Sequence, residues 1–203
     1  MDTNSNYKNR ALSSLQGRWL NPCLGTLICF AIGGALSSVG MKSSTIISVI
    51  SLLLFPLVWG YEVELLVFVR RGTYDIGMMV QRGYQDFVRI FTTMLLRYVY
   101  ITLWSLLLVI PGIIKTFSYA LTTYILLDNP QMKNNEAIEL SMAMMDGHKM
   151  QLFLLFLSFI GWAILSAFTL GIGFIWLYPY VNTSCAHFYE DRKKEYFEAN
   201  QAQ

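Results

Sequence analysis

Residues 150–188 read MQLFLLFLSFIGWAILSAFTLGIGFIWLYPYVNTSCAHF and contain no aspartate, glutamate, lysine or arginine. A glycine-containing break, Leu170-Gly171-Ile172-Gly173, divides this run into two halves. Each half is long enough to cross a lipid bilayer, because a spanning helix needs roughly 20 apolar residues. Two such helices joined by so short a turn form a transmembrane helical hairpin. The run therefore predicts an all-α, polytopic membrane protein.

The composition of the whole chain agrees with this class. Of its 203 residues, 55% are hydrophobic and only 14% are charged, and the mean hydropathy is +0.44. Ordinary soluble domains contain about 25% charged residues. A formal net charge of +2 is too small to indicate nucleic-acid binding. Residues 1–203 are therefore expected to form a single integral-membrane domain that binds no nucleic acid.

Six segments of the chain are apolar over about a spanning length. They follow one another as three pairs, and their approximate bounds are 20–39, 45–69, 91–110, 113–127 and the two halves of 150–188. The fourth segment is the shortest, because a helix over 113–127 rises only about 22 Å at about 1.5 Å per residue. The expected fold is a bundle of six transmembrane helices arranged as three hairpins.

The positions of lysine and arginine predict the orientation, because these residues accumulate on the cytoplasmic side of a membrane. Most of the 15 basic residues lie before the first segment, between the second and third, between the fourth and fifth, or after the sixth. All these places share one side if every segment crosses. The pattern predicts that both termini are cytoplasmic, and the fourth segment must cross to keep Arg192, Lys193 and Lys194 there.

A weaker amphipathic stretch precedes each odd-numbered segment. The clearest one repeats apolar residues at helical spacing, at Ile76, Met79, Val80, Gly83, Tyr84, Phe87 and Val88. Such helices usually lie in the headgroup region. The chain is therefore expected to contain three similar units, at about 8–70, 72–128 and 134–190, each a cytoplasmic-side amphipathic helix followed by a hairpin. The similarity reflects either internal triplication or three hairpins without common ancestry.

Ionisable side chains inside a membrane are costly, so they are candidate functional residues. Glu62 and Glu64 lie in the second segment, Arg97 in the third and Asn182 in the sixth. Glu62 and Glu64 point in different directions, because two residues turn a helix by about 200°. We expect one of them to face Arg97 and the other to reach towards the interface. The pair either belongs to an ion or proton route or fixes how two helices pack.

Prolines and small residues predict helix breaks and close packing. Pro111 and Gly112 should end the third segment, and Pro179 should kink the sixth, where a nearby polar side chain satisfies the carbonyl that the proline frees. Small residues recur every fourth position in the first segment, at Gly25, Cys29, Gly33 and Ser37. This spacing lets two helices approach closely, either within the chain or between two copies.

Several stretches of the second half resemble one protein family. They are Ile110-Pro-Gly-Ile-Ile-Lys115, Met145-Asp-Gly-His-Lys149, Leu157-Ser-Phe-Ile-Gly-Trp162, Leu177-Tyr-Pro-Tyr180 and Phe188-Tyr189. Their order and spacing resemble the integral-membrane family catalogued as domain of unknown function 975, and the resemblance extends over nearly the whole chain. It implies a bacterial cytoplasmic-membrane helical bundle without an established activity. The architecture is also similar, more distantly, to the membrane domains of some glycerophosphodiester phosphodiesterases.

Two functional hypotheses follow. The sequence contains no HExxH, CxxC, phosphate-cradling glycine loop or nucleophile elbow, so it predicts no catalytic, metal or cofactor site. The first hypothesis is a non-enzymatic membrane accessory or scaffold linked to lipid or envelope homeostasis, with membrane lipids as partners. The alternative is a small transporter or channel that uses Glu62, Glu64, Arg97 and Asn182. Protein partners and the oligomeric state are left open.

Overall fold

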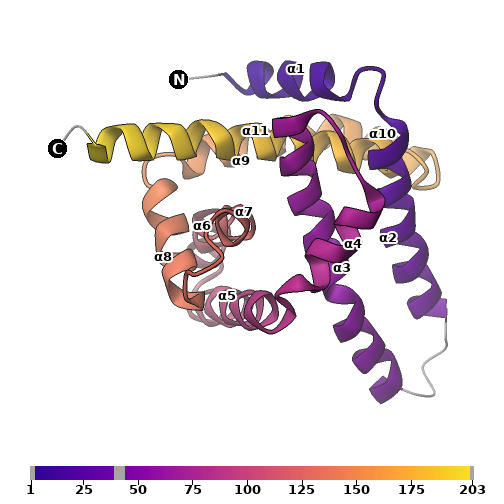
Figure 1. The fold of residues 1–203 in the computed structure, drawn as a ribbon, viewed down its shortest axis with the longest axis horizontal. Helices are drawn as coiled ribbons and strands as arrows, with labels where there is room; N and C mark the ends of the chain where they lie inside the picture. Colours follow the sequence, from indigo (N-terminus) through magenta and orange to yellow (C-terminus); the bar gives the residue numbers. More distant parts are fainter. Residues whose placement is uncertain (1–2, 39–43, 202–203) are drawn as a thin grey trace.

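The computed structural model describes residues 3–38 and 44–201, and it describes side chains within 3–31 and 56–201. All secondary structure in these ranges is α-helical, which confirms the predicted all-α class there. The helices are α1 (Asn4–Leu15), α2 (Leu20–Ser38), α3 (Ser44–Arg71), α4 (Ile76–Gln85), α5 (Phe87–Leu107), α6 (Val109–Ser118), α7 (Thr122–Asp128), α8 (Asn134–Met144), α9 (Lys149–Leu157), α10 (Ile160–Phe168) and α11 (Phe174–Gln201) (Figure 1).

Three helical stretches of the described residues are long and apolar enough to cross a membrane. They are Phe87–Leu107, Val109–Asp128 and Lys149–Phe168. The first is α5, the second contains α6 and α7, and the third contains α9 and α10. The part of α2 whose side chains are described, Leu20–Ala31, is apolar but shorter. The chain thus has the character of a membrane protein, whereas the count of six crossings stays a prediction.

Large apolar side chains are exposed near the ends of these stretches. The exposed fraction is 78% at Leu106, 82% at Phe168 and 96% at Leu170. Contiguous apolar surface of this kind is unfavourable in water and marks a site of contact with lipid or protein. This exposure agrees with a lipid environment around the ends of α5 and α10.

The break between α5 and α6 lies at Leu108, which has extended backbone angles. The predicted break at Pro111 and Gly112 is therefore a few residues too late. Proline has no N–H and its ring clashes with the carbonyl four residues earlier, so the hydrogen-bond ladder of α5 stops near Leu107. Pro111 itself lies in the first turn of α6, where the missing N–H is tolerated. The fourth segment consequently covers the 20 residues Val109–Asp128, with a turn at residues 119–121 between α6 and α7.

Two glycines allow consecutive helices to approach each other closely. A Cβ on Gly112 would lie 2.8 Å from the Cα of Ser105, and a Cβ on Gly173 would lie 2.8 Å from the Cα of Ser166. The first contact joins α5 to α6, and the second joins α10 to the start of α11. The serine precedes the glycine by seven positions in both cases, a repeat that sequence analysis missed.

The helices pack against one another in a cyclic pattern. α2 packs on α3, α5 on α6, and α10 on α11. The preceding helices pack on other pairs. α1, which precedes α2, packs on α11, and α4, which precedes α5, packs on α3. α8, which precedes α9 and α10, packs on α5 and α7. α3 also contacts α7 and α11, so these three helices meet. The division of the chain into three repeat-like units stays a prediction.

The apolar faces of α1 and α4 are partly covered by protein. Tyr7, Ala11 and Leu15 of α1 are fully buried, and α1 packs on α11. A Cβ on Gly60 of α3 would lie 3.1 Å from the Cα of Gly83, so α3 and α4 approach each other at a pair of glycines. The cover is partial: Met79 of α4 is fully buried, whereas Val80 and Tyr84 of the same predicted apolar face are 40% and 41% exposed. The location of these helices in the headgroup region stays a prediction.

The helices run in different directions. In Figure 1, α11 runs across α2 and α3, while α5, α6 and α7 are seen nearly end-on. Their relation to a common membrane normal, and hence the arrangement as three membrane hairpins, stays a prediction.

The small-residue face of α2 packs within the chain where it is described. A Cβ on Gly25 would lie 3.1 Å from the ring of Tyr61, so this glycine lets the tyrosine of α3 approach α2. Cys29 is partly buried and packs against the core. Gly33 and Ser37 lie outside the residues whose side chains are described.

Candidate functional site

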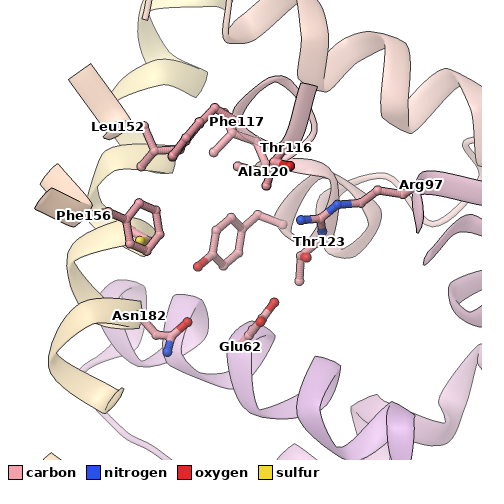
Figure 2. A pocket seen from close by; sticks show the side chains of 12 residues that line it. Glu62, Arg97, Thr116, Phe117, Ala120, Thr123, Leu152, Phe156 and Asn182 are labelled. Atoms are coloured by element: carbon pink, nitrogen blue, oxygen red, sulfur yellow. The ribbon is translucent and has the colours of Figure 1, made fainter. Parts of the chain in front are cut away.

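α3, α7 and α11 meet at a cavity of about 180 Å³, which we call the central cavity (Figure 2). Glu62 of α3, Arg97 of α5, Thr123 of α7 and Asn182 of α11 line it. Much of the remaining wall is apolar, and it includes Phe117, Ala120, Leu121, Leu152 and Phe156. The structure therefore brings three of the four predicted polar residues to one place, beside an apolar surface.

A second hollow adjoins the central cavity. It has a volume of about 230 Å³, lies between α3 and α5, and shares Glu62, Arg97 and Thr123 with the central cavity. We call it the side cavity, and its other lining residues include Trp59 and Tyr98. The three shared side chains therefore stand where two cavities meet.

Glu62 and Arg97 face the central cavity from different helices without forming a direct ion pair. Within the described residues, no contact within 4.0 Å joins their charged groups. The guanidinium of Arg97 lies 3.9 Å from the sulfur of Met94, and Glu62 interacts with the hydroxyl of Thr123 and with the charge of Arg97. Figure 2 shows the Thr123 side chain between the two charged groups. The predicted pairing of Glu62 with Arg97 is thus an interaction across a cavity.

Glu64 does not belong to this site. Its side chain is only 2% exposed, and its Oε2 lies 2.9 Å from the Nε of Arg82 on α4. The backbone N–H of Asp75 also donates to Oε1 of Glu64, at 3.3 Å. The helical turn of about 200° between Glu62 and Glu64 explains why they have different partners. We expected the second carboxylate to reach the interface, but it is buried and pairs with the partly buried Arg82 instead.

Asn182 lines the central cavity, but it does not satisfy the carbonyl that Pro179 frees. The helix α11 continues through Pro179 to Gln201. Pro179 removes the hydrogen bond to the carbonyl of Ile175, four residues earlier. The Nδ2 of Asn182 donates to the carbonyl of Tyr178 at 2.9 Å. This hydrogen bond orients the amide of Asn182 on the side of α11 that faces the cavity.

A cluster of ion pairs joins the C-terminal ends of α3 and α7 to the middle of α11, and sequence analysis missed it. Arg70 forms a bidentate pair with Asp128, at 2.7 and 2.8 Å, and its Nε donates to Glu190 at 2.7 Å. Asp128 also accepts from the Nζ of Lys193 at 2.6 Å and from the hydroxyl of Tyr189 at 2.8 Å. Bidentate arginine–carboxylate pairs combine strength with fixed geometry. The cluster therefore fixes the three helices relative to one another on one side of the central cavity.

The sequence places the charged residues of this cluster at similar offsets from three tyrosines. Arg70 follows Tyr61 by nine positions, and Asp128 follows Tyr119 by nine. Glu190 comes ten positions after a further tyrosine, Tyr180. Charged residues at matching places in three similar segments favour mutual contact, although the sequence alone does not show that the three segment ends meet.

Other contacts join the basic segments that we expected on one side of the membrane. Arg10 of α1 lies 2.6 Å from Asp191 of α11, and Arg18 donates to the carbonyl of Gly72 at 2.9 Å. Within residues 3–31 and 56–201, no group of three or more His, Cys, Asp or Glu side chains is placed to hold a metal ion.

The fold and the cavity indicate a helical membrane protein with a partly open pocket whose polar residues come from several helices. Residues 106–195 match the model of the family described as "Protein of unknown function (DUF975)". The match supports the resemblance in the second half of the chain, covers less than half of the 203 residues, and includes Thr123 and Asn182 but neither Glu62 nor Arg97. Neither the curated proteins nor the solved structures contain a match, and the similarity to glycerophosphodiester phosphodiesterases is not shown.

Proposed function

We propose that the protein is a non-enzymatic accessory of the bacterial cytoplasmic membrane that acts in lipid or envelope homeostasis by binding an amphiphilic membrane component. The central cavity is the main support for this proposal. It places Glu62, Arg97, Thr123 and Asn182 beside an apolar wall. Ligand sites typically combine a mostly apolar lining with a few polar groups that fix the ligand's orientation. A lipid, with a polar head and apolar chains, matches both parts.

The proposed orientation places both termini in the cytoplasm. Its support is the distribution of positive charge together with the contacts of Arg10, Arg18 and Arg70, which link the N-terminal helix, the segment after α3 and the C-terminal helix. Positive residues favour the cytoplasmic side of a membrane. Segments that contact one another through these residues are expected on the same side.

Native mass spectrometry after purification in a mild detergent tests lipid binding. We expect the wild-type protein to retain lipid, and Ala120→Trp, which fills the central cavity, to retain several-fold less. Ala167→Trp is a matched control, because the same substitution is made at an exposed alanine of α10 that lines neither cavity. Equal lipid content in the wild type and Ala120→Trp, with both proteins folded, would contradict the proposal.

A second candidate function is that of a small transporter. The specific observation in its favour is that Glu62, Arg97 and Thr123 line both the central and the side cavity. Glu64 has no part in such a route, because Arg82 holds it elsewhere. Proteoliposomes loaded with ion- or pH-sensitive dyes test this function: transport predicts a flux that Glu62→Gln abolishes. Lipid retention without any flux favours the accessory function.

A further inference from the structure

Two opposite charges face the central cavity without neutralising each other by contact. Arg97 and Glu62 both line the cavity, and no ion pair within 4.0 Å joins them among the described residues. Elsewhere in the same protein, opposite charges do meet: Arg82 lies 2.9 Å from Glu64, and Arg70 lies 2.7 Å from Asp128. The separation of Glu62 from Arg97 is therefore a feature of this site and not of the fold in general.

Charges inside a membrane protein are unfavourable unless partners satisfy them. A ligand with a single charge would satisfy only one of these two groups and would be repelled by the other. A ligand that carries both signs satisfies both at once. The guanidinium of Arg97 suits a phosphate or carboxylate, with which arginine forms bidentate hydrogen bonds. The carboxylate of Glu62 suits an ammonium group, and Thr123 and Asn182 add neutral hydrogen-bonding groups.

The volumes of the two cavities limit the size of the polar group. They are about 180 and 230 Å³, below the roughly 300–1,000 Å³ of pockets for drug-sized ligands. A small headgroup suits a space of this size. Phe117 and Phe156 extend the central cavity with an apolar surface, on which an acyl chain or a methylene backbone can pack.

We propose that the central cavity binds a small zwitterion, with its phosphate or carboxylate at Arg97 and its primary ammonium at Glu62. This inference rests on the proposed function and specifies the ligand class. The same chemistry occurs in the headgroup of an aminophospholipid and in a free zwitterion such as phosphoethanolamine.

The test measures dissociation constants of the purified full-length protein in detergent, by calorimetry. The probes are dihexanoyl phosphatidylethanolamine, dihexanoyl phosphatidylglycerol and phosphoethanolamine. Because the two lipids have the same chains, their affinity ratio reports recognition of the ammonium group. We expect the ethanolamine lipid to bind the wild type at least about tenfold tighter, since a charge-assisted hydrogen bond contributes about that factor. Tighter binding of the lipid than of free phosphoethanolamine identifies the lipid as the source, and the reverse identifies a soluble zwitterion.

Variants assign the two ends of the ligand. Glu62→Gln should reduce the affinity ratio to about one without weakening the glycerol lipid, and Arg97→Gln should weaken both lipids at least about tenfold. Glu198→Gln is the control, because this carboxylate is 66% exposed and lines neither cavity, so the substitution should leave both the fold and the affinity ratio unchanged. If a single variant fails to fold, the double variant Glu62→Gln with Arg97→Gln removes both charges together, and it should fold and show no preference.

Equal affinity of the wild type for the two lipids, or an unchanged ratio in Glu62→Gln, would overturn the inference. The proposed function fails separately, if lipid retention does not respond to filling the cavity. If lipid retention depends on the cavity but the protein shows no headgroup preference, the zwitterion inference is wrong and the proposed accessory function is still supported.

Discussion

Glu62 and Glu64 are two residues apart on one helix, yet they have unrelated surroundings. Their separation by about 200° around α3 could be predicted from the sequence, because it depends only on helix geometry. Sequence also singled out Glu62, Arg97 and Asn182, since each is polar within an apolar segment. It could not assign Arg82 to Glu64, because that contact depends on how the chain after α3 returns and packs α4 against it.

Glu64→Gln should lower the free energy of unfolding by roughly 3–5 kcal/mol. The side chain of Arg82 is only 17% exposed, and breaking a buried ion pair leaves a charge without a partner. Thermal unfolding in detergent measures this effect, and adding Arg82→Gln to the same chain should restore part of the loss. Glu198→Gln serves as the control, because Glu198 is 66% exposed and should matter by less than about 0.5 kcal/mol. Equal effects of the two glutamate substitutions would refute the buried pair.

His148 should make stability depend on pH. Burial, followed by the neighbouring charge of Arg192, lowers the pKa of His148 below its ordinary value of 6.5, although Glu195 and Asp146 partly oppose this shift. Protonation therefore favours the unfolded state, so the contribution is complete above about pH 6.5 and is lost as the pH falls. Lowering the pH from about 7.5 to 5 should reduce the melting temperature more in the wild type than in His148→Asn. Parallel curves for the two proteins would exclude this role of His148.

At the scale of helices and turns, Pro111 indicated a break but not its position. The sequence suggests that the proline ends one helix, whereas in the structure it begins the next one, and α5 ends at Leu107. The amphipathic pattern of residues 76–88 likewise predicted which face of α4 is apolar. It did not predict that α3 packs against this face. Periodicity describes one helix at a time, so it cannot identify which neighbour packs on a face.

Gly112→Ala should destabilise the protein, because the added Cβ would lie 2.8 Å from the Cα of Ser105 and force α5 and α6 apart. We expect a loss of about 1–3 kcal/mol, as for overpacked cores, measured by thermal unfolding. Gly161→Ala is the control: it lies within α10, and nothing lies within 4 Å of its added Cβ. This second change should be neutral or stabilising by up to about 1 kcal/mol. The same response to both substitutions would argue against the close contact.

For the molecule as a whole, the sequence established the class more firmly than the arrangement. Of the six apolar segments identified in the sequence, three are helical stretches of spanning length in the described part of the structure. The convergence of α3, α7 and α11 could not be derived from hydropathy, because hydropathy measures the preference for lipid and not the order of neighbours. The ion pairs of Asp128 with Arg70 and Lys193 hold α3, α7 and α11 together, and these residues are distant in the sequence.

Reporter fusions along the chain test the proposed orientation. Fusions after residues 72, 130 and 201 should report a cytoplasmic location, and a fusion at residue 171 should report the opposite side, because the basic segments lie together. A cytoplasmic signal at residue 171, or an external one after residue 201, would contradict six crossings with both termini inside.

The reactivity of Cys185 tests most directly whether a ligand can enter the central cavity. All three cysteines are free, and Cys185 lines the cavity, so Cys23→Ser with Cys29→Ser isolates it as a probe. In the folded protein, a small methanethiosulfonate reagent should modify Cys185, and Ala120→Trp or added dihexanoyl phosphatidylethanolamine should slow the reaction. Modification only after unfolding, or at a rate that neither the tryptophan nor the lipid changes, would contradict an accessible binding cavity between α3, α7 and α11.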